Sequence, residues 1–242
     1  MSMKEVYLYP HLGFGDAIIL NALIRHFCDI NESVVLFCKD RYYESIRWML
    51  RDIKNLTYHQ VPFNNGDSEI QKFIRNNNLG DRVIKLGFDK LLELCSKGIP
   101  FYESFYLMYD LSPEFRFSNF YYERNFEFEN YVYNKLNPNN EKYIFVIDDS
   151  DHHLGKLQIP EERLPKDYKI IKYDKKLNYD DSKFVMFNYY KILENAEEIH
   201  TLETAFFEFI RSVNVDKKKV NVHSYLRNYI SSPIDEYNFL EI

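Results

Sequence analysis

Hydrophobic residues along the chain fall into short runs of strand length, and these alternate with longer segments that have helical periodicity. The run Ser33-Val-Val-Leu-Phe-Cys38 is the clearest, because its apolar residues are continuous, as in a parallel strand buried on both faces. Strands are predicted over residues 5–9, 33–38, 56–61, 81–86, 142–147, 168–173, 198–202 and 220–225, and helices over 39–53, 68–76, 183–194 and 203–213. The alternation predicts βαβ units, and therefore an α/β fold with parallel sheets covered on both faces.

A change of pattern divides the chain into two parts. Between residues 97 and 136 the alternation stops, and it starts again after the turn Asn137-Pro-Asn-Asn140. Proline and asparagine clustered in this way are typical of a linker. We therefore predict two Rossmann-like domains facing a cleft, an N-terminal domain of residues 1–136 and a C-terminal domain of residues 141–242.

The first predicted strand leads into a glycine turn and then into an amphipathic helix. Gly13 and Gly15 lack the Cβ that keeps a ligand away from the backbone, and Asp16 follows at the N-cap or in the first turn of the helix. A helix N-terminus after a strand leaves N–H groups facing an anion or a polar substrate, although a plain turn capped by Asp16 gives the same pattern. The segment is neither a dinucleotide fingerprint, since Ile18 stands where a small residue is required, nor a Walker loop.

A second strand-to-helix junction has Glu203 and Thr204 at the start of its helix. These side chains either cap the helix or hold an anionic ligand at its N-terminus, where the helix dipole favours a diphosphate. A further polar segment, Asp148 to Lys156, follows the predicted strand 142–147. Polar residues at the carboxyl end of a parallel strand lie where α/β sheets bind ligands.

The motif His11-x-Gly13-x-Gly15-Asp16, followed by an apolar helix, resembles the opening of GT-B-fold glycosyltransferases of the heptosyltransferase kind. The resemblance implies a GT-B-like fold and metal-independent transfer of a sugar from a nucleotide-sugar donor to an acceptor hydroxyl. It also implies an acceptor-side N-terminal domain, a donor-side C-terminal domain, and Asp16 as the candidate catalytic base. The residues implied to bind the donor are Gly13, Gly15, Asp149, His152, His153, Lys156, Glu203 and Thr204. The chain departs from the family at Ala205, where glycine is usual, and at Glu208, where histidine is usual.

The aromatic and charged segment between residues 98 and 129 is a candidate acceptor-binding insertion. Aromatic rings suit the faces of sugars, and arginines suit charged groups. The candidate acceptor-binding residues are His11, Tyr102, Arg116 and Arg124. Helical packing with surface ion pairs is the alternative interpretation of this segment.

Other functions remain open from the sequence. Asp149 and Asp151 form a D-x-D pattern, by which GT-A glycosyltransferases hold Mn²⁺ or Mg²⁺ on the donor diphosphate. A zinc site at His152 and His153 is disfavoured, because adjacent residues on a strand point to opposite faces. A non-catalytic nucleotide or nucleotide-sugar binding protein is the alternative of another class, and a scaffold without a ligand is a third.

The composition of the chain limits which partners and which cell compartment we expect. The formal net charge is −6 without a long basic run, which argues against a nucleic-acid partner. Three cysteines without a C-x-x-C pair favour a reducing compartment, and no apolar run reaches membrane-spanning length. We therefore expect a cytoplasmic protein with no transmembrane segment and no cofactor, whose partners are a nucleotide-sugar and a glycan or other hydroxyl acceptor.

Overall fold

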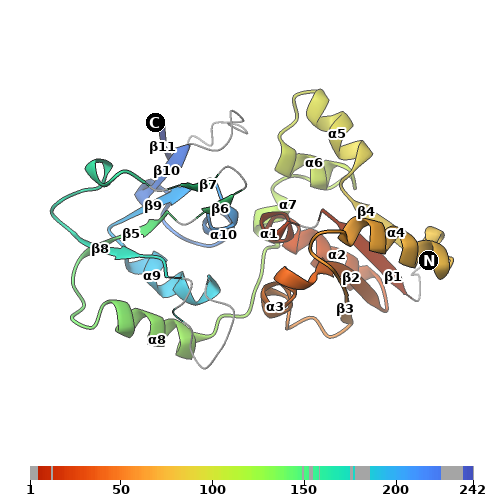
Figure 1. Cartoon of the computed structure of the whole chain (residues 1–242), viewed down its shortest axis with the longest axis horizontal. Helices are drawn as coiled ribbons and strands as arrows, with labels where there is room; N and C mark the ends of the chain where they lie inside the picture. The colour runs from red at the N-terminus through yellow and green to blue at the C-terminus, as the bar shows by residue number, and fades with distance from the viewer. Residues whose placement is uncertain are drawn as a thin grey trace. The chain divides into compact units, whose positions relative to one another are not determined.

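The computed structural model describes residues 5–11, 13–148, 150–152, 155–157, 159–174, 177, 186–224 and 237–241. For Asp151, His152 and Lys156 only the backbone is described, and Asp149 and His153 lie outside the described residues. The chain divides into two compact units, Met1–Glu123 and Arg124–Ile242 (Figure 1).

Unit 1 contains a four-stranded parallel sheet. Its strands, in the spatial order β3-β2-β1-β4, are β1 (Val6–Pro10), β2 (Val34–Lys39), β3 (Leu56–Val61) and β4 (Val83–Leu86). Its helices are α1 (Phe14–Ile19), α2 (Asn21–Ile30), α3 (Asp40–Met49), α4 (Gly66–Asn76), α5 (Asp89–Ser96), α6 (Phe101–Leu107) and α7 (Phe115–Ser118), with a 3₁₀ turn at Gly80–Arg82.

Helices cover both faces of this sheet. On one face the rings of Phe37 and His59 contact Phe73 of α4, with centroids 5.8 and 4.1 Å apart. On the other face Tyr58 contacts Tyr43 of α3, at 5.6 Å. Side chains along the strands point alternately to these two layers, so most residues of β1 and β2 are buried. This arrangement explains the continuous apolar runs in the sequence.

Unit 2 contains a five-stranded parallel sheet in the order β11-β10-β9-β5-β8. The strands are β5 (Tyr143–Ile147), β8 (Lys169–Lys172), β9 (Glu198–Leu202), β10 (Val220–Ser224) and β11 (Asn238–Glu241). The hairpin strands β6 (Ser150–His152) and β7 (Gly155–Leu157) pair separately and antiparallel. The helices are α8 (Phe126–Leu136), α9 (Tyr190–Asn195) and α10 (Ala205–Ser212), with 3₁₀ turns at Glu161–Arg163, Phe187–Tyr189 and Lys217–Lys219.

The two faces of the unit 2 sheet are covered differently. Phe145 of β5 points to the helical face, where its ring stacks on Tyr189 at 5.4 Å and contacts Phe206 of α10 at 6.1 Å. On the opposite face Ile144 and Val146 pack with Ile159 and Leu164, which belong to the segment leading into β8. The core of the unit therefore lies on both sides of β5.

The predicted α/β fold with two parallel-sheet units is confirmed. The strands 56–61 and 198–202 have the predicted bounds, and β11 and the β6–β7 hairpin are additional elements. In the segment of the predicted helix 183–194, the described residues form a 3₁₀ turn and α9 over 187–195, and residues 183–185 lie outside the described part of the chain. The segment after Gly13 forms two successive helices that meet at Leu20.

The division between the units falls at a different place from the predicted linker. Asn137 forms a closed turn, in which its side chain donates to the Glu141 carbonyl at 2.9 Å and accepts from the Glu141 N–H at 3.1 Å. This turn joins α8 to β5 within unit 2, where the Tyr133 ring of α8 lies 6.5 Å from the Tyr143 ring of β5, and α8 also packs against α9. Among the described helices, none combines the length and apolar character that crossing a bilayer requires.

Candidate functional site

Each sheet has one point where the direction of strand addition reverses. In unit 1 the chain passes from β1 to β2 and β3 on one side and then returns to β4 on the other side of β1. In unit 2 the chain passes from β5 to β8 and then to β9 on the other side of β5. Ligands of open α/β sheets bind at the carboxyl ends of the strands at such switch points. The β1–β4 and β5–β9 switch points are therefore the candidate sites.

The glycine turn lies at the carboxyl end of β1, at the first switch point. Gly13 is the N-cap of α1, Gly15 is its second residue, and Asp16 is the third. The Asp16 carboxylate folds back over Gly13, so that a Cβ built on Gly13 would lie 2.6 Å from Asp16 Oδ2. The absence of a side chain at residue 13 is what leaves room for this carboxylate orientation. Asp16 thus lies in the first turn rather than at the N-cap.

His11 lies at the same switch point and contacts the end of the neighbouring strand. Its Nε2 accepts a hydrogen bond of 3.1 Å from the backbone N–H of Phe88, in the turn after β4. The ring is half-buried among Phe88, Phe101 and Phe105, with centroid distances of 5.1, 5.9 and 5.6 Å. The structure therefore brings together two predicted site segments, His11 and the glycine turn, with the turn after β4, which the sequence did not single out.

A basic and aromatic cluster occupies the carboxyl ends of β2 and β3. Lys39 Nζ lies 5.0 Å from the centroid of the Phe63 ring, and Arg41 Cζ lies 4.9 Å from the same centroid. Tyr42 links this ring to Phe14 of α1, with centroid distances of 5.9 Å to each. Such cations on aromatic faces can hold charged groups or sugar rings. Sequence reasoning missed the cluster, and the only available signal was the position of Lys39 and Phe63 after predicted strands.

The second switch point carries Glu203 and Thr204, between β9 and α10. Thr204 is the N-cap of α10 in extended conformation, but its side chain makes no capping hydrogen bond. The interpretation in which the Thr204 hydroxyl caps the helix therefore does not describe this structure. The first N–H groups of the eight-residue helix are not satisfied by that hydroxyl, and the helix dipole gives them a partial positive charge.

The neighbouring strand ends of unit 2 contribute an ion pair. Asp148 follows β5, and its Oδ2 lies 3.3 Å from Nζ of Lys172, the last residue of β8. Lys172 is a cation at the carboxyl end of the unit 2 sheet that the sequence did not identify. Of the remaining predicted donor residues, Lys156 and His152 lie on the β6–β7 hairpin, where Asp151 is opposite Lys156 and His152 is opposite Gly155. Asp149 and His153 lie outside the described residues.

The side chains of three predicted acceptor-binding residues make packing contacts or ion pairs within the protein. The Arg116 side chain is completely buried, and its Cζ lies 5.6 Å from the centroid of the Tyr102 ring, which is also buried. Arg124 bonds to Glu129 at 2.9 Å and to Glu194 at 2.9 Å, and it lies 4.0 Å from the Tyr190 ring centroid. These contacts favour the packing interpretation of the 98–129 segment for Tyr102, Arg116 and Arg124. They leave His11 as the acceptor candidate at a switch point.

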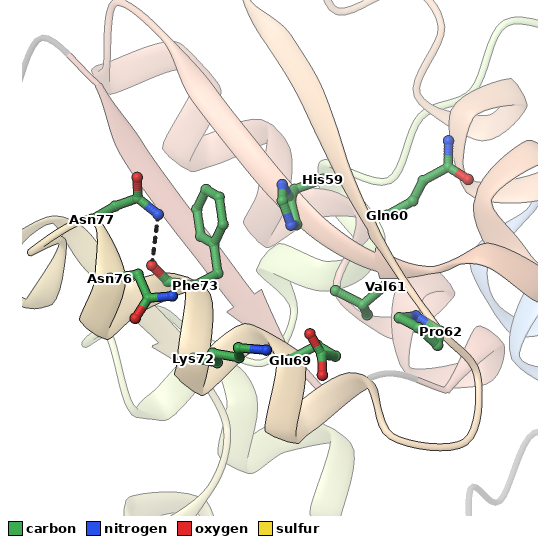
Figure 2. A pocket seen from close by; sticks show the side chains of 9 residues that line it. All are labelled: His59, Gln60, Val61, Pro62, Glu69, Lys72, Phe73, Asn76 and Asn77. Atoms are coloured by element: carbon green, nitrogen blue, oxygen red, sulfur yellow. Dashed lines mark hydrogen bonds between the residues drawn. The ribbon is translucent and has the colours of Figure 1, made fainter.

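Two small clefts in unit 1 lie elsewhere. The larger has a volume of about 220 Å³ between β3 and α4, and it is lined by His59, Gln60, Val61, Pro62, Glu69, Lys72, Phe73, Asn76 and Asn77. Figure 2 shows His59 and Phe73 projecting into this region from the strand and the helix. The other cleft, of about 140 Å³, involves α2 and α7. None of the predicted ligand-binding residues lines either cleft, so the candidate sites at the switch points do not coincide with these clefts.

A buried histidine pair lies between β9 and β10. His200 Nδ1 is 3.0 Å from His223 Nε2, and His200 Nε2 is 3.2 Å from Glu198 Oε2. Burial, His200 and Arg163 together lower the pKa of His223 to about 4. Burial also lowers the pKa of His200, although Glu198 opposes that change. Both rings are neutral at pH 7. Within the described ranges, no three His, Cys, Asp or Glu side chains gather as a metal site requires.

Comparisons with known proteins bear on this arrangement. A glycosyl transferase family 9 structure from Veillonella parvula DSM 2008 matches 100% of this chain and 86% of its own, with a TM-score of 0.56 and 10% identity. The chain has a glycosyltransferase fold. A second match is the iron-containing dodecameric glycosyltransferase TibC from enterotoxigenic E. coli H10407, with a TM-score of 0.51 and 9% identity, covering 92% of this chain and 59% of TibC. No protein-family model and no curated protein matches the sequence.

This likeness confirms the predicted resemblance to GT-B glycosyltransferases at the level of the fold. The two parallel sheets of this fold are the sheet of unit 1 and the sheet of unit 2. Each sheet has one of the predicted strand-to-helix junctions at its switch point.

Proposed function

We propose that the chain is a glycosyltransferase that moves a sugar from a nucleotide-sugar to an acceptor hydroxyl. One observation carries the proposal: in a fold shared with solved glycosyltransferases, both polar junctions occur at switch points of parallel sheets. A likeness of fold alone is compatible with many functions, but polar side chains at both switch points suit an enzyme with two substrates.

In this proposal unit 1 binds the acceptor, and Asp16 is its general base. The carboxylate accepts the proton of the acceptor hydroxyl while the hydroxyl oxygen forms a bond to the anomeric carbon of the donor. The carboxylate is held over Gly13, at the end of β1, and this defined orientation supports the assignment. His11 lies at the same switch point and supplies a hydrogen bond to the acceptor.

Unit 2 binds the nucleotide-sugar. The anomeric C–O bond breaks as the new bond forms, and the electron pair leaves on the nucleoside diphosphate, whose charge must be stabilised. The N-terminus of α10 with Glu203 and Thr204, Lys172 at the end of β8, and the 148–156 segment would provide that site. Helix N–H groups and a lysine can stabilise a diphosphate without a metal, so we propose a metal-independent reaction.

The experiment that tests this function is a thermal-shift screen of the full chain against UDP, GDP, ADP, CMP and TDP, each with Mn²⁺ and with EDTA. A ligand at a hundred times its Kd adds about 2.7 kcal/mol of apparent stability, which is readily measured. We expect one diphosphate to raise the Tm equally under both conditions. A shift that requires Mn²⁺ favours the alternative site at Asp149 and Asp151, and the absence of any shift contradicts the proposal.

Binding without turnover would identify the non-catalytic alternative. The matching nucleotide-sugar is therefore incubated with simple glycoside acceptors, and release of the nucleoside diphosphate is followed by chromatography. Transfer that depends on Asp16 supports the enzyme. A diphosphate that binds while its nucleotide-sugar is neither transferred nor hydrolysed indicates a binding protein.

A further inference from the structure

The turn that follows β4 has an unusual backbone conformation. Gly87 has a φ of +116° and Phe88 a φ of +70°, and Phe88 is the N-cap of α5. A bulky residue in this region of φ is rare, and it persists where surrounding contacts determine the conformation. The Phe88 ring supplies such contacts, with its centroid 4.7 Å from the Tyr9 ring and 5.1 Å from the His11 ring. The turn is therefore held in place by the end of the neighbouring strand.

This turn fits closely around one edge of the His11 ring. A Cβ built on Gly87 would lie 2.7 Å from His11 Cδ2 and 2.8 Å from His11 Nε2. The Phe88 N–H donates to the same Nε2 at 3.1 Å. Gly87 thus has two reasons to be glycine, its positive φ and the space that His11 occupies. Residues 77 positions apart in the sequence form one assembly at the β1–β4 switch point.

The hydrogen bond determines which nitrogen of the neutral ring carries the proton. Because Nε2 accepts from a backbone N–H, the ring proton is assigned to Nδ1. Nδ1 lies across the ring from the Cδ2–Nε2 edge that faces Gly87, and no hydrogen bond from another described residue engages it. The half-buried ring, held by Phe88, Phe101 and Phe105, therefore directs one N–H donor away from the turn.

We infer that Gly87 and Phe88 are positioning residues, which hold His11 as the Nδ1–H tautomer so that it donates a hydrogen bond to an oxygen of the bound acceptor. The role of the acceptor rests on the proposed function, whereas the tautomer and its cause do not. A fixed tautomer gives a site a single, directed donor, as in other systems where the partner of one histidine nitrogen sets the role of the other. This assigns a function to a turn that lies outside both strand-to-helix junctions.

Nitrogen NMR of the full chain tests the tautomer directly. The protein labelled with ¹⁵N-histidine has seven histidines, and the His11→Gln variant assigns the His11 signals. We expect a pyrrole-type Nδ1 and a pyridine-type Nε2 at pH 8. The opposite pattern, or an even mixture of the two tautomers, overturns the inference.

A pair of glycine variants tests the cause. Gly87→Ala and Gly98→Ala both place alanine at a positive φ, but only residue 87 has His11 within 4 Å, since nothing lies within 4 Å of a Cβ at residue 98. Loss of the single-tautomer pattern in Gly87→Ala, with the pattern kept in Gly98→Ala, supports the positioning role. The same spectrum for both variants contradicts it.

Two His11 variants test the donor. The amide nitrogen of asparagine stands near the position of Nδ1, and that of glutamine near the position of Nε2. Using the nucleotide-sugar found by the binding screen and p-nitrophenyl glycosides as acceptors, we expect His11→Gln to lower the ratio of transfer to donor hydrolysis about tenfold, the effect of one lost hydrogen bond. His11→Asn keeps a donor near the position of Nδ1, so this ratio should stay within about threefold of the wild-type value.

Equal losses of this ratio in the two variants would overturn the donor role, because a residue that only fills space does not distinguish them. If no variant and no wild-type protein transfers sugar, the proposed function fails and the donor role with it. The NMR result then still decides whether Gly87 and Phe88 set the His11 tautomer.

Discussion

The two switch points differ in how their polar groups are held. In unit 1 they are fixed by close contacts across neighbouring strand ends, with Asp16 over Gly13 and His11 against the Gly87–Phe88 turn. In unit 2 the N-cap Thr204 makes no side-chain capping bond, and an ion pair joins Asp148 to Lys172 at the ends of β5 and β8. In the proposed function, a base and a donor held in place by such contacts suit a neutral hydroxyl, which needs exact orientation. A helix N-terminus and a lysine suit a diphosphate, which needs charge.

The largest expected effect is at Asp16, the proposed base in unit 1. Asp16→Asn keeps the size of the side chain but removes the proton acceptor, so we expect transfer to fall by about 10²-fold or more while the Tm changes little. Binding of the nucleoside diphosphate, assigned to unit 2, should stay close to wild type. The measurements are kcat for transfer and the ligand-induced Tm shift, and an Asn variant with wild-type kcat contradicts the role of Asp16.

The next effect separates packing from ligand binding at Arg124. Glu129 is only 1% exposed at its side chain, and its burial raises the pKa of its carboxyl, although Arg124 opposes that change. Removing Arg124 leaves this carboxyl without its cation, and breaking a buried pair costs about 3 kcal/mol or more. Urea unfolding of Arg124→Ala should show this loss. The control is Lys142→Ala, which removes an ion pair between an exposed lysine and Glu197, 3.4 Å apart. This variant should change the free energy of unfolding by under about 1 kcal/mol. A wild-type stability with weakened acceptor binding would favour the acceptor interpretation instead.

Unit 2 should also lose stability in acid through its histidine pair. His223 titrates at about 4 in the folded chain and near 6.5 when unfolded, so only the unfolded chain takes up the proton between these values. The contribution of neutral His223 to the free energy of unfolding is therefore fully present above pH 6.5. As the pH drops toward 4, this contribution is lost, and the free energy of unfolding falls by about 3 kcal/mol. Urea titrations across this range measure the slope. His223→Gln should reduce it, and an unchanged slope in that variant would show that His223 does not contribute.

A smaller effect is expected at the glycine that accommodates Asp16. In Gly13→Ala the new methyl group displaces the end of the Asp16 side chain, which is flexible enough to move, so transfer should fall about tenfold with little loss of stability. Gly80→Ala is the matched control, since nothing lies within 4 Å of a Cβ there. Equal kcat values for the two variants would mean that the orientation of Asp16 over Gly13 is not required.

The smallest effect concerns the donor site. Thr204→Val removes a hydroxyl that does not cap α10, so the helix should keep its stability. If the hydroxyl binds the diphosphate, affinity should fall about three- to tenfold, as for one neutral hydrogen bond. Titration calorimetry with the nucleoside diphosphate checks the affinity. A lower Tm with unchanged affinity would assign Thr204 to the helix alone.

Local patterns were sufficient to predict most strands of the two sheets and both strand-to-helix junctions. Segments of buried parallel strands such as 34–38 and 143–147 are apolar throughout, and helices separate the strands along the chain. Glu203 and Thr204 were found for the same reason, because they follow a strand directly. The short strand Asn238–Glu241 was missed, since four residues carry little periodic signal.

Long-range contacts could not be predicted in this way. Nothing local to Gly87 or Phe88 indicates that they hold His11, and nothing near Arg116 indicates complete burial beside Tyr102. Asn137-Pro-Asn-Asn140 has the composition of a linker, but the side chain of Asn137 closes it into a turn within unit 2. Proline and asparagine are typical both of a linker between two units and of a turn within one unit. Only the packing of α8 within unit 2 distinguishes these two possibilities.

Release of the nucleotide from nucleotide-sugars tests the central claim most directly. The wild-type chain and Asp16→Asn are incubated in EDTA with UDP-, GDP-, ADP-, CMP- and TDP-linked sugars and a mixture of glycoside acceptors, and the products are separated by mass. A glycosylated acceptor and an equal amount of nucleotide product, formed by the wild type and reduced about 10²-fold or more in the variant, is the predicted result. Nucleotide binding with no product for any donor, or equal product from both proteins, would contradict it.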